Sequence, residues 1–189
     1  MDLVTLHART VQVWLGYVDG VQENQWDAAT PCTDWTVRDL VNHVVGEDLW
    51  TVPLLEGSTI EEVGDRFEGD VLGSDPIGVA RDSGRAAADA TASAVPGGGT
   101  VRLSYGEDSV DNYVGQLAAD HLVHAWDLAV ATGQDAELDE DLVSAVAAWY
   151  APWESAYRAG GAVGARSDTS NNPQDDLILG FGRDPRWHA

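Results

Sequence analysis

Long amphipathic segments dominate this sequence and restrict the folds that it can adopt. In the first segment apolar side chains recur at three- and four-residue spacing between Leu3 and Tyr17, which predicts a helix over residues 2–19. Helical patterns follow at residues 37–55 and 76–94, and a longer one begins at residue 108 or 109 and stops at Gly133. Four long helices favour an all-α fold built as a helical bundle.

The segments between these helices carry weaker patterns. Thr36 is the predicted N-cap of the second helix, because Asp39 stands at its third helical position, as a capping box requires. We expect a loop over residues 57–75 and a fifth helix over residues 139–159. The expected remainder is one short extended segment over 100–104 and a C-terminal extension, with a loop over 160–176 and a short apolar end over 177–181.

The charge of the chain excludes two classes of partner. Thirty-two acidic residues against ten arginines, with no lysine, give a formal net charge of −22. Such a chain lacks the cationic surface that binds nucleic acid, and it lacks the one that binds an anionic membrane. Eight Trp, five Tyr and two Phe argue against a disordered chain. We expect a folded protein that binds neither nucleic acid nor membrane.

Cysteine content and the N-terminal sequence indicate the compartment. Cys32 is the single cysteine, so an intramolecular disulfide and a Cys-rich metal cluster are excluded. Residues 1–20 contain charged side chains and no continuous apolar stretch, unlike a signal peptide. The apolar stretch at 142–153 is too short to span a bilayer. We therefore expect a cytoplasmic protein.

Polar side chains share the apolar face of the predicted helix that ends at Gly133. Asp120 and His124 are four residues apart and project from adjacent turns toward one point, as ligands do in helical metal sites. His43, among core residues of the helix over 37–55, is the candidate third ligand, and such a site keeps open positions for water or substrate. The same pattern also fits an Asp120–His124 ion pair with His43 as an ordinary core histidine.

Four other side chains have two interpretations each. Asp127 follows His124 by three residues and either orients that imidazole or pairs with an arginine. His121 is either a structural histidine or an additional ligand or acid–base group, and Glu47 is either an exposed carboxylate or a general base. Cys32 lies at the entry to the second predicted helix, which favours a packing role over a nucleophilic one.

Three blocks of the sequence resemble a known family. They read Thr30-Pro-Cys-Thr-Asp-Trp-Thr-Val-Arg-Asp-Leu-Val-Asn-His43, then Asp120-His-Leu-Val-His-Ala-Trp-Asp-Leu-Ala129 with Thr132-Gly-Gln, and finally Gly182-Arg-Asp-Pro-Arg-Trp187. In this order they resemble the metal-binding N-terminal domain of the mycothiol-dependent maleylpyruvate isomerase family, within the DinB-like superfamily.

The resemblance implies a single domain over residues 1–189, folded as a DinB-like four-helix bundle around a divalent metal. The implied ligands are His43, Asp120 and His124, and the implied metal is zinc, with nickel as the alternative for nitrogen ligands. Members of the superfamily often use a low-molecular-weight thiol such as mycothiol to transfer or isomerise a small-molecule substrate. The oligomeric state stays open, a homodimer included.

Two departures from the family bear on activity. The isomerase has Glu where this chain has Asp120, and it has a further C-terminal domain for which we expect no room in 189 residues. The metal site tolerates these departures better than the isomerase activity does. We expect a metal- and thiol-dependent transferase or isomerase, and the alternative is a non-catalytic metal- or ligand-binding module.

Overall fold

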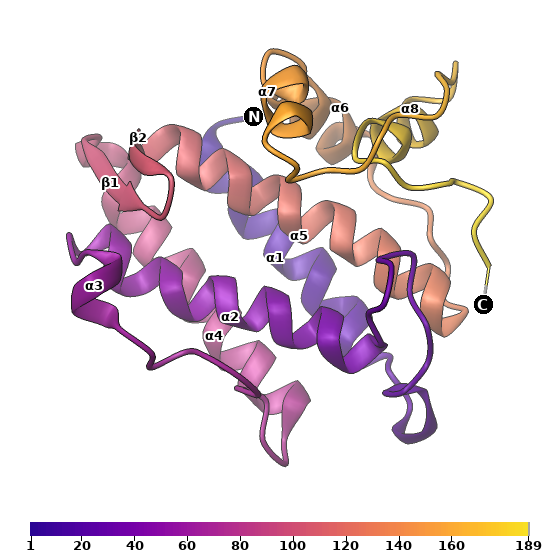
Figure 1. The fold of residues 1–189 in the computed structure, drawn as a ribbon, viewed down its shortest axis with the longest axis horizontal. Helices are drawn as coiled ribbons and strands as arrows, with labels where there is room; N and C mark the ends of the chain where they lie inside the picture. Colours follow the sequence, from indigo (N-terminus) through magenta and orange to yellow (C-terminus); the bar gives the residue numbers. More distant parts are fainter. Residues whose placement is uncertain (189) are drawn as a thin grey trace.

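Four long helices form the largest part of the computed structural model, which describes residues 1–188 (Figure 1). They are α1 (Leu3–Asp19), α2 (Val37–Leu55), α4 (Pro76–Ala94) and α5 (Val110–Thr132). Their positions agree with the four long helices expected from the apolar spacing, so the prediction of a mainly helical fold is confirmed.

Local capping determines where the two central helices begin and end. The Thr36 hydroxyl accepts from the backbone N–H of Asp39, and the Asp39 carboxylate accepts from the backbone N–H of Thr36, which completes the expected capping box. Ser109 caps the start of α5, and Gly133 ends it with a left-handed conformation that glycine adopts freely. His43 therefore lies about two turns into α2.

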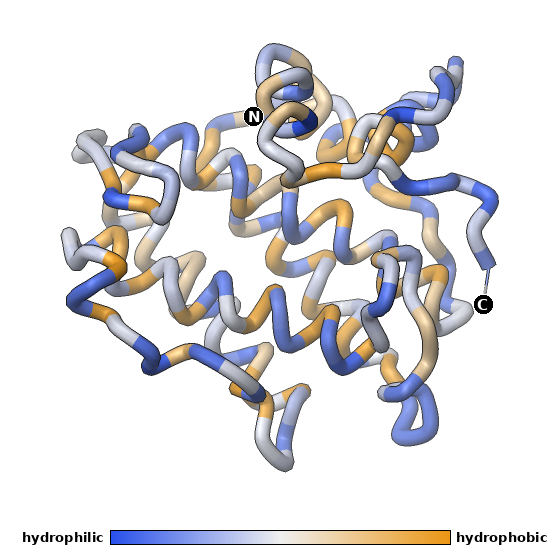
Figure 2. The backbone as a smooth tube through the Cα atoms, viewed as in Figure 1, coloured by the Kyte–Doolittle hydropathy of each residue, from blue (hydrophilic) through white to orange (hydrophobic). Residues whose placement is uncertain are grey.

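The four long helices pack around an apolar core. α1 contacts α4 and α5, and α2 contacts the same two helices. His43 in α2 approaches Asp120 in α5, and Thr51 further along α2 contacts Tyr113, so these two helices run antiparallel. Hydrophobic residues recur along each long helix (Figure 2), and the fully buried ones between them include Trp14, Val41, Val44 and Leu128.

Two predictions for the other segments were wrong in detail, and a third was incomplete. The expected helix over 139–159 is two helices, α6 (Glu140–Tyr150) and α7 (Glu154–Ala159), because Pro152 has no backbone N–H to donate. The extended segment expected over 100–104 is confirmed as β1 (Thr100–Leu103), but β1 pairs antiparallel with a second strand, β2 (Gly106–Ser109), that was not predicted. The apolar end over 177–181 belongs mostly to α8 (Pro173–Gly180), which begins within the expected loop.

Short elements and the C-terminal helices complete the described residues. α3 (Ile60–Val63) lies in the expected loop over 57–75, and single 3-10 turns occupy Glu23–Gln25 and Val95–Gly97. α6 packs on α5 and α8, and in Figure 1 these C-terminal helices lie along one side of α5. Within residues 1–188 no helix has both the length and the apolar character needed to cross a bilayer.

His7 in α1 is a titratable side chain inside the core. It is 0% exposed, and neither ring nitrogen has a hydrogen-bond partner among the described residues. Burial, helped by the nearby His121, lowers the pKa of His7 from 6.5 to about 3. His7 therefore binds a proton more readily in the unfolded chain than in the folded chain. The stability due to a neutral His7 is complete above pH 6.5 and is lost as the pH falls toward 3.

We expect the free energy of unfolding of His7→Leu to fall less steeply with decreasing pH than that of the wild type. In the wild type, His7 should lower the free energy of unfolding by up to about 1.4 kcal/mol for each pH unit below its unfolded-state pKa. Urea denaturation at pH 7, 6 and 5 measures this slope, and His188→Ala, at an exposed position, is the control. Equal slopes for the wild type and His7→Leu would contradict the assignment.

Candidate metal centre

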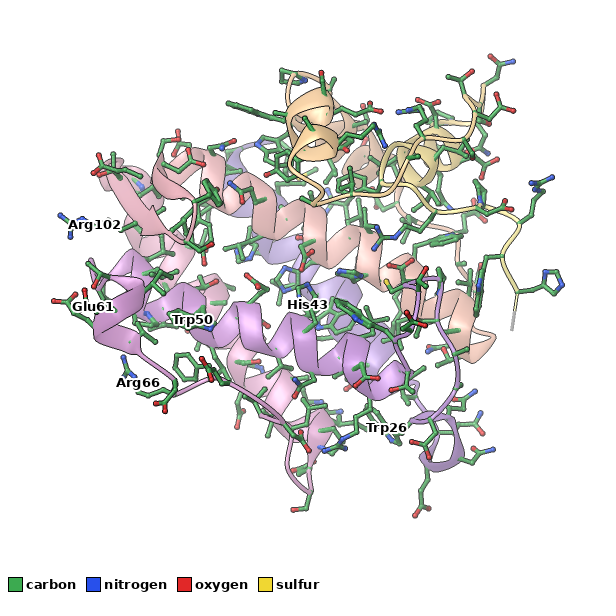
Figure 3. The ribbon with its side chains drawn as sticks, viewed as in Figure 1. Trp26, His43, Trp50, Glu61, Arg66 and Arg102 are labelled. Carbon is green, nitrogen blue, oxygen red and sulfur yellow. The ribbon has the colours of Figure 1, made fainter. Side chains whose placement is uncertain are left out.

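Three side chains converge where α2 faces α5. His43 projects from α2 toward α5 (Figure 3), and its Nε2 lies 3.4 Å from Asp120 Oδ2. His124 Nε2 lies 3.3 Å from Asp120 Oδ1, and the three residues offer ligand atoms that all lie within 4.8 Å of one another. The structure thus brings together the three residues selected from the sequence, while their role as metal ligands stays a prediction.

The donor chemistry of this group fits a divalent cation. Burial alone would raise the pKa of Asp120, but the adjacent His124 and His43 rings outweigh burial and hold that pKa well below its ordinary value. Asp120 Oδ2 is itself buried, and no described residue makes a hydrogen bond to it. An ionised carboxylate beside two imidazole nitrogens is a ligand set that zinc accepts.

An open cavity of about 630 Å³ extends from these three side chains. The loop before α2, the facing sides of α2 and α5, and the chain around α7 and α8 all contribute to its wall, including residues 161–164. The lining residues include four large aromatic ones, Trp35, Tyr113, Tyr157 and Phe181. A cavity of this size, lined by both polar and apolar side chains, is compatible with a small-molecule site.

The loop before α2 places an aromatic ring against the histidines. Asp34 adopts a left-handed conformation with a φ of 66°, and the backbone N–H of Thr30 donates to the Trp35 carbonyl, which closes a tight loop. The Trp35 ring centroid then lies 5.0 Å from that of His43 and 6.1 Å from that of His124. This contact restricts the orientation of both imidazoles.

Asp127 fulfils both of its predicted alternatives at once. Its carboxylate lies 2.9 Å from Nδ1 of His124 and 3.1 Å from the Arg183 guanidinium, and it is 0% exposed. Although burial raises the pKa of Asp127, Arg183 and His124 outweigh it and keep that pKa below its ordinary value. Asp127 therefore stays ionised and fixes the ring of His124 from the side opposite Asp120.

Arg183 is a site residue that the reasoning from spacing missed. It follows α8, and its Nη2 lies 3.4 Å from the Cys32 sulfur as well as 3.1 Å from Asp127. The only signal for it in the sequence was its place in the third block that resembles the family. Cys32, for which a packing role was favoured, is half-buried and lines the cavity.

Cys32, His124 and Asp127 form a second group with ligand atoms within 4.8 Å of one another. The sulfur of Cys32 lies 3.3 Å from Asp127 and 3.9 Å from Nδ1 of His124. The Arg183 guanidinium already contacts the sulfur and the carboxylate, so a metal cation there would face a fixed positive charge. The group that contains His43 is the better candidate for a metal.

The remaining two candidates, Glu47 and His121, lie in different places, Glu47 at the cavity and His121 in the core. Glu47 lines the cavity one turn after His43, and burial, followed by the charge of Asp120, raises its pKa. The interpretation of Glu47 as an exposed carboxylate was wrong, because its side chain is half-buried in the cavity wall. His121 is 1% exposed and contacts Asp48 at 3.1 Å instead of lining the cavity, as its structural interpretation expected.

The model of the mycothiol maleylpyruvate isomerase N-terminal domain family matches residues 7–129 of this chain. The chain belongs to this family. The match covers His43, Asp120 and His124 together with Cys32 and Asp127, whereas Arg183 lies beyond it. This family is DinB-like, as the three sequence blocks indicated.

Two relatives of the chain were found, and their names state no reaction. Two uncharacterized proteins of Mycobacterium tuberculosis, from strains CDC 1551 / Oshkosh and ATCC 25618 / H37Rv, are each 35% identical to it. Each comparison extends over 151 residues, which is 75% of this chain and 74% of the relative. No solved structure matches the chain.

Proposed function

We propose that this protein binds one divalent metal ion, zinc, through His43, Asp120 and His124 and presents it to a small-molecule thiol. Nickel is the alternative cation for the same nitrogen ligands. The convergence of these three donors at one end of an open cavity of about 630 Å³ carries the proposal. The family description, which names mycothiol, supports a thiol as the partner.

The same proposal extends to the fold. We take the four long helices to be the DinB-like four-helix bundle and residues 1–189 to be a single domain. The packing of α1 and α2 on both α4 and α5 supports this view, because each long helix then buries its apolar face against two others. The cavity lies between this group of helices and the C-terminal segment.

Residues around the three donors prepare them to bind. An ionised Asp127 can only accept a hydrogen bond, so Nδ1 of His124 carries a proton. Although burial lowers the pKa of His124, Asp120 and Asp127 raise it well above its ordinary value, so Nε2 must release a proton when a metal binds there. Arg183 compensates the charge of Asp127 inside the protein. A divalent metal, when bound, supplies positive charge that lowers the pKa of a thiol or of water in contact with it.

Glu47 gives the cavity a proton-transfer group. Because burial and Asp120 raise its pKa, Glu47 keeps its proton to a higher pH than an exposed glutamate does. In the proposed transferase or isomerase it exchanges a proton with the substrate on the side of the cavity that α2 forms. The formal net charge of −22 disfavours long-range attraction of an anionic substrate, which favours a neutral electrophile.

Cobalt substitution tests the thiol part of this proposal. We expect protein reconstituted with Co²⁺ to gain a sulfur-to-cobalt charge-transfer absorption when 2-mercaptoethanol is added. Ethylene glycol, which has a hydroxyl in place of the thiol, should produce no such absorption. A cobalt spectrum that does not change when the thiol is added would refute the thiol role. Thiol binding without turnover of any tested electrophile would favour the non-catalytic metal- or ligand-binding module.

A further inference from the structure

A second cluster of titratable side chains lies behind the candidate metal centre, on the core side of α2 and α5. Asp48 in α2 is 0% exposed and His121 in α5 is 1% exposed, and their nearest charged atoms, Asp48 Oδ1 and His121 Nε2, are 3.1 Å apart. Neither residue lines the cavity. The function proposed above makes no use of this pair.

Neighbouring groups fix both members of the pair. Nδ1 of His121 lies 2.7 Å from the Leu117 carbonyl oxygen, which can only accept, so Nδ1 carries a proton and Nε2 faces Asp48. The other oxygen of Asp48 accepts from the Ser83 hydroxyl of α4 at 3.4 Å. The pair therefore links α2 with α5 directly and α4 with both through Ser83.

The position of the pair along the helices relates it to the metal centre. Asp48 is five residues after His43, a rise of about 7.5 Å along α2. His121 directly follows Asp120 in α5, about 100° around the helix, and is buried in the core. A shift of α2 along α5 would thus change the Asp48–His121 contact and the His43–Asp120 distance together.

The contact between Asp48 and His121 depends more strongly on the relative position of α2 and α5 than the surrounding apolar packing does. Hydrophobic contact is non-directional, so it tolerates small sliding of one helix along another. Two buried groups of opposite charge tolerate little separation, because each would be left uncompensated in the interior. The only other polar contact between the side chains of α2 and α5 on the core side among the described residues is that of Thr51 with Tyr113, at 3.3 Å.

We propose that the buried Asp48–His121 pair is a positioning element that sets the separation of His43 from Asp120 and His124. The pair touches neither metal nor substrate, and it acts by fixing the register of α2 against α5. This inference rests on the proposed function, since it concerns the geometry of the three proposed ligands.

Asp48→Asn is the direct test, because it removes the charge and keeps the shape of the side chain. We expect its Kd for Zn²⁺ to rise at least about tenfold, as it does when residues that orient metal ligands are changed. The visible spectrum of its Co²⁺ form should also differ from that of the wild type, since this spectrum reports ligand geometry. Val18→Ala, which destabilises a fully buried position in α1, should leave the Kd and the spectrum unchanged.

A double variant separates positioning from folding stability. Asp48→Leu with His121→Leu replaces the buried charges by apolar groups, a change that often restores stability. We expect this variant to fold and still to show the weaker Zn²⁺ binding and the altered Co²⁺ spectrum. Wild-type Kd and spectrum in either folded variant would overturn the inference alone. A wild-type protein that binds neither Zn²⁺ nor Co²⁺ would overturn the proposed function, and the inference with it.

Discussion

Purified wild-type protein should contain about one divalent ion per chain, and His124→Ala should contain almost none. His124 is 5% exposed and lies between Asp120 and Asp127, so its loss removes a proposed ligand and leaves two carboxylates without their shared partner. His43→Ala should have the same effect, because a carboxylate and one imidazole are too few ligands to retain zinc. Elemental analysis of protein grown with added zinc measures the ratio of metal to chain.

Two choices make this measurement decisive. Purification should avoid nickel resin, because nickel competes well for nitrogen ligands. His188→Ala, which removes an exposed histidine, is the matched control and should keep the full metal content. If the wild type is empty after purification and again after reconstitution with zinc, Asp120 and His124 are an ion pair and His43 lines the cavity without binding a metal.

The long helices could be predicted because their signals are local. Apolar spacing identifies the buried side of each helix, and Thr36 with Asp39 marks the start of α2 within four residues of sequence. The same locality explains the prediction for α5, in which Asp120 and His124 are one turn apart. A local signal for the division between α6 and α7 was also present, at Pro152, and the expected helix over 139–159 ignored it.

The rest of the site depends on contacts between distant parts of the chain. Arg183 is 56 residues from Asp127 and 151 residues from Cys32, and no periodicity relates such positions. Glu47 likewise lies in the wall of a cavity whose other residues come from distant parts of the chain. A pattern read along one helix identifies side chains that share a face, but it does not identify what covers that face.

Arg183→Met should lower the free energy of unfolding by about 3 kcal/mol, although Arg183 lies outside the region that matches the family. Methionine keeps most of the aliphatic stem but removes the guanidinium from Asp127, which is 0% exposed. Arg183 itself is only 15% exposed, so water compensates little of the lost interaction. Urea denaturation of the metal-free protein measures the change.

Arg186→Met is the control, because its side chain is 89% exposed and its contact with Asp184 is a surface ion pair. Such a pair contributes little, so this variant should lie within about 0.5 kcal/mol of the wild type. Adding Asp127→Asn to Arg183→Met removes the uncompensated charge and should recover part of the loss. If Arg183→Met unfolds at the wild-type urea concentration, Asp127 is compensated by His124 alone. The C-terminal segment would then cover the cavity without stabilising the charge that orients His124.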